Sequence, residues 1–133
     1  MPSLPAYTFV REERLKSETT ISLLFKEGAS YMAYPLRVTW LVQPVPTAFR
    51  VQIAISVPKK NFRKSTDRNR IKRLMREAWR VHKHLFYEQL AVQQLHISMM
   101  LLYVAKEELP YAEVASGIRK VLRKFPVPPA DNA

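Results

Sequence analysis

Ten basic side chains fall within one short segment of the 133-residue chain. Residues 59–80 contain ten Lys or Arg and two acidic residues, so this segment carries a formal +8 of the chain's +11. Lysine and arginine bind phosphate, and arginine does so through a planar fork of N–H donors. This concentration of charge predicts a surface built for a polyanion rather than charge spread for solubility.

The second half of this segment is predicted to form a helix. Ser65, Thr66 and Asp67 are candidate N-caps, and neither glycine nor proline occurs at residues 68–86. One arc of the helix is apolar and should pack on the rest of the domain: Ile71, Leu74, Met75, Ala78, Val81, His82 and Leu85. The adjoining arc is almost purely cationic: Arg68, Asn69, Lys72, Arg73, Arg76, Arg80 and Lys83.

Like charges recur at every i, i+4 step of the cationic arc, at residues 68, 72, 76 and 80. A helix that is charged for solubility mixes signs, because like charges at this spacing repel each other. A bound polyanion would relieve this repulsion, which favours nucleic-acid binding over a solvated face. A DNA-binding helix-turn-helix is disfavoured because a strand, not a helix, is predicted before residue 58. An anionic membrane ranks lower because the apolar face is modest.

The run Arg68-Asn69-Arg70-x-Lys72-Arg73-x-x-Arg76, preceded by Ser56-Val57-Pro58-Lys59-Lys60, resembles the signature of the bacterial ribonuclease P protein component. The order of the flanking elements resembles that family over about residues 11–125. The resemblance implies RNA binding by nine residues: Lys59, Lys60, Arg68, Asn69, Arg70, Lys72, Arg73, Arg76 and Arg80.

In that family the protein assists an RNA enzyme and carries no catalytic residue of its own. The resemblance therefore implies two partners, a ribonuclease P RNA subunit and a precursor transfer RNA, with one protein per RNA subunit. The RNA subunit, with magnesium held mainly by the RNA, removes the 5′ leader. A ribosomal or other structural RNA-binding protein without a role in cleavage is the alternative that composition and charge also allow.

The family binds the leader in a cleft between the first helix and the sheet. The resemblance places six residues in this cleft: Ile21, Phe25, Arg37, Thr39, Arg68 and Lys72. Ile21 and Thr39 stand where many members have aromatic residues, so the platform for base stacking is reduced. The loop at residues 61–67 also departs from the family because it has no glycine. Trp40 is in phase with Leu36 and Val38, which favours a place in the core.

The remaining periodicities give the order α-β-β-α-β-α and an α+β, two-layer sandwich. Helices are expected at residues 18–27, 68–86 and 110–125, and strands at residues 36–42, 49–57 and 96–105, with residues 28–34 as a loop. The first two strands should form a hairpin, and a crossover should join the second strand to the third. The family resemblance, not the residues themselves, implies that this crossover is left-handed, as in the ribosomal protein S5 domain 2-like fold.

Length and composition indicate a single domain over residues 1–133, and the resemblance implies that this domain binds RNA. An N-terminal arm is expected at about residues 1–10 and a disordered tail at 126–133. The chain has no cysteine, which excludes disulfides and thiolate zinc sites and fits the cytoplasm. No apolar run approaches the roughly 20 residues of a membrane span. His82 and His84 do not share a helix face, so no metal site is expected.

Overall fold

The computed structural model describes residue 15, residues 18–43 and residues 50–125. The expected N-terminal arm and C-terminal tail lie outside these residues. The described elements, in chain order, are α1 (Glu18–Glu27), β1 (Ala29–Ala33), β2 (Leu36–Val42), β3 (Val51–Ser56), α2 (Ser65–Gln93), β4 (Ile97–Tyr103) and α3 (Tyr111–Lys124). The expected α+β class is confirmed, and α1 and β2 have the bounds that the sequence predicts.

Four strands form one sheet in the order β1-β2-β4-β3. β4 pairs antiparallel with β2 and parallel with β3, so β3, α2 and β4 form the expected crossover. The predicted hairpin between residues 36–42 and 49–57 is wrong, because β4 lies between these two strands. β4 is apolar except for Ser98 and the Tyr103 hydroxyl and has little alternation, which suits its central place between β2 and β3.

The strand β1 corrects a second expectation, since residues 28–34 were predicted to be a loop. β1 pairs with β2 in a true hairpin, with Ala29 opposite Trp40 and Ala33 opposite Leu36. The Tyr31 hydroxyl donates a hydrogen bond to the backbone oxygen of Val121, 2.7 Å away, and so ties the strand to α3. This five-residue strand has a weak pattern of its own because pairing and packing, rather than propensity, stabilise it.

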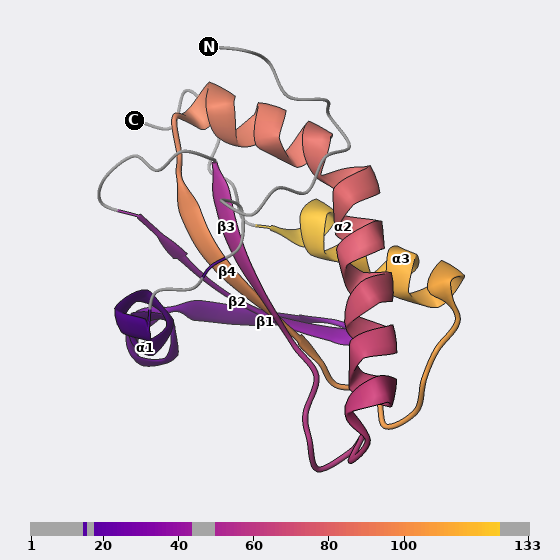
Figure 1. Cartoon of the computed structure of the whole chain (residues 1–133). Coiled ribbons are helices and arrows are strands. Elements are labelled where there is room, and N and C mark those ends of the chain that lie inside the picture. The colour runs from indigo at the N-terminus through magenta and orange to yellow at the C-terminus, as the bar shows by residue number, and fades with distance from the viewer. Residues whose placement is uncertain (1–14, 16–17, 44–49, 126–133) are drawn as a thin grey trace.

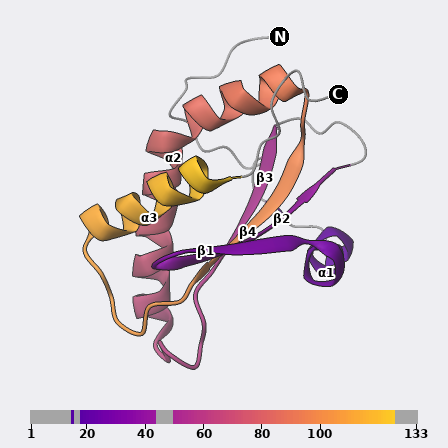
Figure 2. The same ribbon diagram turned by 180° about the vertical axis from the view of Figure 1, so that it is seen from behind.

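The two faces of the sheet have different neighbours. α2 and α3 pack together and cover one face, whereas α1 lies on the opposite side (Figures 1 and 2). The helix-covered face carries the main core, which includes these strand residues: Leu36, Val38, Val51, Ile53, Met99, Leu101 and Tyr103. The other face, which we call the open face, is covered in part by α1, whose Leu24 is buried.

Helix α2 is longer than expected and changes direction in its second half (Figure 1). Ile71, Met75 and Ala78 are buried, as the predicted apolar arc requires. The arc is wrong farther along, because Leu85 is 61% exposed and Trp79 and Phe86 are buried instead. At 100° per residue the buried positions still share one arc, which comprises Ile71, Met75, Ala78, Trp79, Phe86 and Leu90. Leu85 lies just outside this arc, so the predicted arc was centred too far to one side. In the part of the chain that is described, no helix combines the length and apolar character that a membrane crossing needs.

The contact between α3 and the β1–β2 turn depends on Gly117. A Cβ atom at this position would lie 2.7 Å from Cδ of Pro35. Alanine in place of a helical glycine ordinarily adds about 1 kcal/mol of stability. We expect Gly117→Ala instead to lower the free energy of unfolding by about 1–3 kcal/mol, because the methyl group overpacks this contact.

Urea unfolding measures this change. Ser116→Ala is the matched control, since it introduces alanine one position earlier in the same helix, at a half-buried site. It should leave the free energy of unfolding unchanged or raise it by about 0.5 kcal/mol. A Gly117→Ala protein more stable than the parent would contradict the packing described above.

Candidate nucleic-acid interface

The basic residues of the first half of α2 and of the loop before it lie on the outside of the helix layer. Eight of them form the set that we call the cationic ridge: Lys59, Lys60, Arg68, Arg70, Lys72, Arg73, Arg76 and Arg80. Each of these side chains is exposed or half-buried, and Asn69 beside them is exposed. The apolar side of the same helix is buried, so the charges occupy the remaining sides of the helix, with Arg68 beside the apolar arc and Arg70 on the far flank.

Arg68 has a structural contact in addition to its charge. Its Nη1 donates to the backbone oxygens of Phe62, at 2.7 Å, and of Arg63, at 2.9 Å. Phe62 is buried, and its ring centroid lies 5.8 Å from that of Tyr103. Arg68 and Phe62 together hold the glycine-free loop that carries Lys59 and Lys60.

The start of α2 differs from the predicted cap. The helix begins at Ser65, and the N-cap residue is Lys64, which makes no side-chain capping hydrogen bond. Asp67 therefore lies in the first turn, where a carboxylate is favoured by the helix dipole. Its Oδ1 accepts a hydrogen bond from Nη2 of Arg70 at 2.6 Å.

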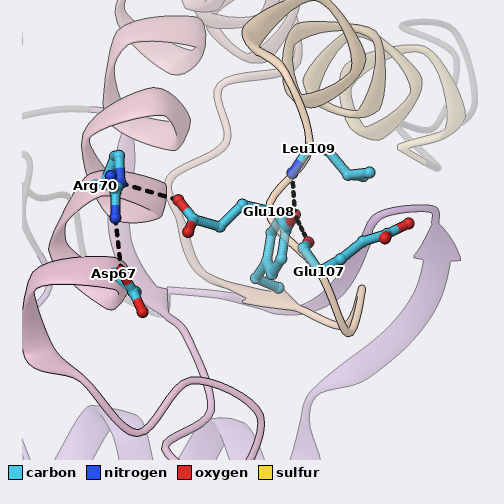
Figure 3. Close-up of polar contacts among 6 residues, drawn as sticks. Asp67, Arg70, Glu107, Glu108 and Leu109 are labelled. Carbon is cyan, nitrogen blue, oxygen red and sulfur yellow. Dashed lines mark hydrogen bonds and ion pairs between the residues drawn. The ribbon is translucent and has the colours of Figure 1, made fainter.

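Acidic groups neutralise part of the ridge, which is less purely cationic than the sequence suggested. Arg70 Nε also lies 2.9 Å from Oε1 of Glu108, in the loop between β4 and α3 (Figure 3). Arg80 forms an ion pair with Glu77, and the hydrogen bond from Arg80 lowers the pKa of the Glu77 carboxyl. Glu108 is remote in sequence from the ridge, and no local pattern could have identified it.

On the open face, Arg37 and Thr39 point away from α2 and α3. Arg37 is exposed, and its Nη2 donates to Oγ of Ser30 at 3.5 Å. A hollow of about 220 Å³ here is lined by Ser30, Tyr31, Met32 and Arg37. The hollow was missed because β1 was read as a loop; the signal was the alternation of Ser30 and Met32 with Tyr31 and Ala33.

The α1 side of the expected cleft is sparsely aromatic. Phe25 is 69% exposed, so it is not a core residue, and Ile21 is half-buried. Thr39 lies against the end of α1, because a Cβ at Gly28 would be 2.9 Å from Cγ2 of Thr39. Trp40 packs on the core, with its ring centroid 4.6 Å from that of Phe125, which confirms the core interpretation.

The open face and the cationic ridge meet at one end of the sheet. In the strand register, Arg37 is opposite Leu102, and Leu102 is opposite Ser56, the last residue of β3. The chain then passes within three residues to Lys59 and into α2. Arg37 thus lies one row from the end of the sheet at which the chain leaves β3 for α2, whereas Arg68 and Lys72 belong to the helix layer. The residues of the expected leader cleft are therefore divided between the two faces of the sheet at this end, with Arg37 on the open face and Arg68 and Lys72 in the helix layer.

One histidine of α2, His82, adds little positive charge to the basic surface. Burial, with the positive charge of Arg119 and then His84, lowers the pKa of His82, so its ring is neutral at pH 7. Among the described residues, no three His, Cys, Asp or Glu side chains are grouped in a way that could hold a metal ion.

A charge-conserving change tests the structural role of Arg68. Arg68→Lys keeps the positive charge but cannot reproduce the two hydrogen bonds from one guanidinium nitrogen. We expect the free energy of unfolding to fall by about 1–3 kcal/mol. Arg73→Lys, at an exposed position of the same helix, should change it by less than about 0.5 kcal/mol. Equal effects of the two substitutions in urea unfolding would refute this role.

The comparisons with known proteins point in one direction. A family model described as Ribonuclease P matches residues 9–126 of the chain. A ribonuclease P protein component of Porphyromonas gingivalis strain W83 is 34% identical over 122 residues, which cover 92% of this chain and 89% of that protein. One from Desulfovibrio desulfuricans is 27% identical over 119 residues, covering 90% and 87% of the two chains.

Solved structures show the same fold. The ribonuclease P protein of Staphylococcus aureus superimposes with a TM-score of 0.68 at 22% identity, covering 86% of this chain and 96% of that one. The ribonuclease P protein of Thermotoga maritima gives a TM-score of 0.65 at 23% identity, covering 84% and 96%. At these identities the structural likeness establishes the shared fold, and the sequence matches establish the kinship.

Proposed function

The chain belongs to the ribonuclease P protein family, and on this premise we propose that it is the protein subunit of a ribonuclease P. It binds a catalytic RNA subunit and the 5′ leader of a precursor transfer RNA. The RNA subunit performs the hydrolysis that gives the mature 5′ end, and magnesium is held mainly by the RNA. One protein binds each RNA subunit. With this function the protein would act in the cytoplasm, where its RNA partners are.

The observation that carries this proposal is the cationic ridge, which α2 exposes while its apolar side is buried against the sheet. Two RNAs repel each other because each carries a phosphate charge at every nucleotide. A basic surface placed between them screens this repulsion and releases counterions from both. The complex then needs less magnesium, and the protein aids the reaction without taking part in bond cleavage.

The open face supports a place for the leader. It joins the ridge at Arg37, so a single strand that leaves the active site could pass from basic residues onto the sheet. Phe25 is exposed for base stacking, which contributes about 1–3 kcal/mol per base in single-strand binding proteins. In this arrangement Arg68, Lys72 and Arg76 face the leader, and Arg70 and Arg73 face the RNA subunit.

Reconstitution tests the function directly. We expect the protein, mixed with a bacterial ribonuclease P RNA and a precursor transfer RNA at low magnesium, to yield 5′ maturation that neither component gives alone. The control is a triple variant, Lys59→Gln, Lys60→Gln and Arg73→Gln, which removes exposed charges without touching the core. Binding to RNA without any stimulation of cleavage would instead support a structural RNA-binding protein.

The division of the ridge predicts different effects of two substitutions. Lys72→Gln should weaken the binding of the leader-bearing precursor about fivefold, which corresponds to the loss of one exposed ion pair. It should weaken the binding of mature transfer RNA much less. Arg73→Gln should weaken assembly with the RNA subunit and leave the ratio between the two substrates unchanged. Binding titrations of the assembled enzyme measure both. If Lys72→Gln weakened both substrates equally, this division would be wrong.

A further inference from the structure

One arginine of the cationic ridge is held by two carboxylates. Nη2 of Arg70 lies 2.6 Å from Asp67, and Nε lies 2.9 Å from Glu108 (Figure 3). Asp67 belongs to the first turn of α2, whereas Glu108 comes from the loop between β4 and α3. This loop is fixed by Tyr103, whose hydroxyl donates to the backbone oxygen of Glu107 and accepts from the N–H of Leu109.

The triad of Asp67, Arg70 and Glu108 is negatively charged overall, whereas the neighbouring ridge is positively charged. Two carboxylates and one guanidinium carry a formal charge of −1, next to the basic side chains of the cationic ridge. Exposed ion pairs add little to stability, and the Arg70 side chain is 57% exposed. A gain in folding stability is therefore a weak reason for the arrangement, and nonspecific attraction to RNA is reduced by it.

The triad offers hydrogen-bond donors and acceptors side by side. A guanidinium has five N–H donors, and the two contacts engage Nε and one N–H of Nη2. The remaining donors of Arg70 lie next to carboxylate oxygens that have further lone pairs. A phosphate can only accept hydrogen bonds, and it is repelled by both carboxylates. A ribose 2′-hydroxyl both donates and accepts, and RNA helices display this group across their wide minor groove.

We propose that the triad is a specificity site that recognises a ribose 2′-hydroxyl of the RNA subunit and rejects phosphate. Arg70 donates to the hydroxyl oxygen, and the hydroxyl donates to a carboxylate of Glu108 or Asp67. An RNA of a different shape brings a phosphate to this position and binds more weakly, because the carboxylates of Asp67 and Glu108 repel the phosphate. This inference rests on the proposed RNA-binding function and deepens it.

Glu108→Gln tests the site with a close control. Glu107 is also exposed, and its side chain points away from Arg70 in Figure 3, so Glu107→Gln removes the same charge without touching the triad. Binding of a ribonuclease P RNA and of an unrelated RNA of equal length is measured over a range of salt concentrations. Glu108→Gln should tighten binding of the unrelated RNA about two- to fivefold relative to Glu107→Gln.

Two further readouts identify the contact. The plot of log affinity against log salt for the unrelated RNA should become steeper by about 0.7–0.9, as expected for one added phosphate contact. This gain should vanish in the double variant Arg70→Gln, Glu108→Gln. The contact can also be mapped in a pool of ribonuclease P RNA molecules that each carry 2′-deoxy nucleotides at scattered positions. At one position or more, the loss of the 2′-hydroxyl should weaken binding to the parent protein but not to the Glu108→Gln variant.

The outcomes separate this inference from the proposed function. If the parent protein bound both RNAs alike, or neither, the proposed function would fail. If binding were specific but Glu108→Gln and Glu107→Gln had equal effects, the triad would have no role in recognition. Tighter binding of both RNAs to Glu108→Gln, with no position of 2′-deoxy interference lost, would show a general charge effect and overturn the inference.

Discussion

The burial of one side of α2 against the sheet determines where the basic residues can go. Ile71, Met75, Ala78 and Trp79 are almost completely buried, and the large side chains among them each contribute about 1.5–3 kcal/mol through loss of apolar surface. With this side fixed on the core, the remaining positions of the same helical turns must face outward. The cationic ridge is therefore a consequence of packing, and its self-repulsion is offset by the apolar contacts beneath it.

The same packing leaves the sheet with two unlike faces. α2 and α3 cover one face, while α1 covers the other in part and leaves Arg37 exposed beside a hollow. The crossover from β3 to β4 brings the start of α2 to the end of the sheet where Arg37 lies. A basic helix and an accessible sheet surface thus adjoin each other, which suits a protein that contacts a folded RNA and a single strand together.

The sequence predicted what depends on local pattern and missed what depends on distant partners. The 3.6-residue period identified α1, α3 and the first half of α2, and it placed most basic residues of the helix on one arc, with Arg70 on the far flank. It could not show that β4 would insert between β2 and β3, because strand order is set by which edges pair best. The apolar arc of α2 was centred too far to one side, so Leu85 was assigned to the core and Trp79 was not. Glu108 became a partner of Arg70 only through the fold, and the roles of the basic residues in binding RNA stay predictions.

Crosslinking from single positions tests most directly whether the ridge is the RNA-contacting surface. The chain has no cysteine, so Asn69→Cys on the ridge and Val92→Cys on the exposed far half of α2 can each carry one photoreactive group. The account predicts crosslinks to the ribonuclease P RNA from position 69 and few or none from position 92. Equal crosslinking from both positions, or crosslinking from position 92 alone, would contradict it.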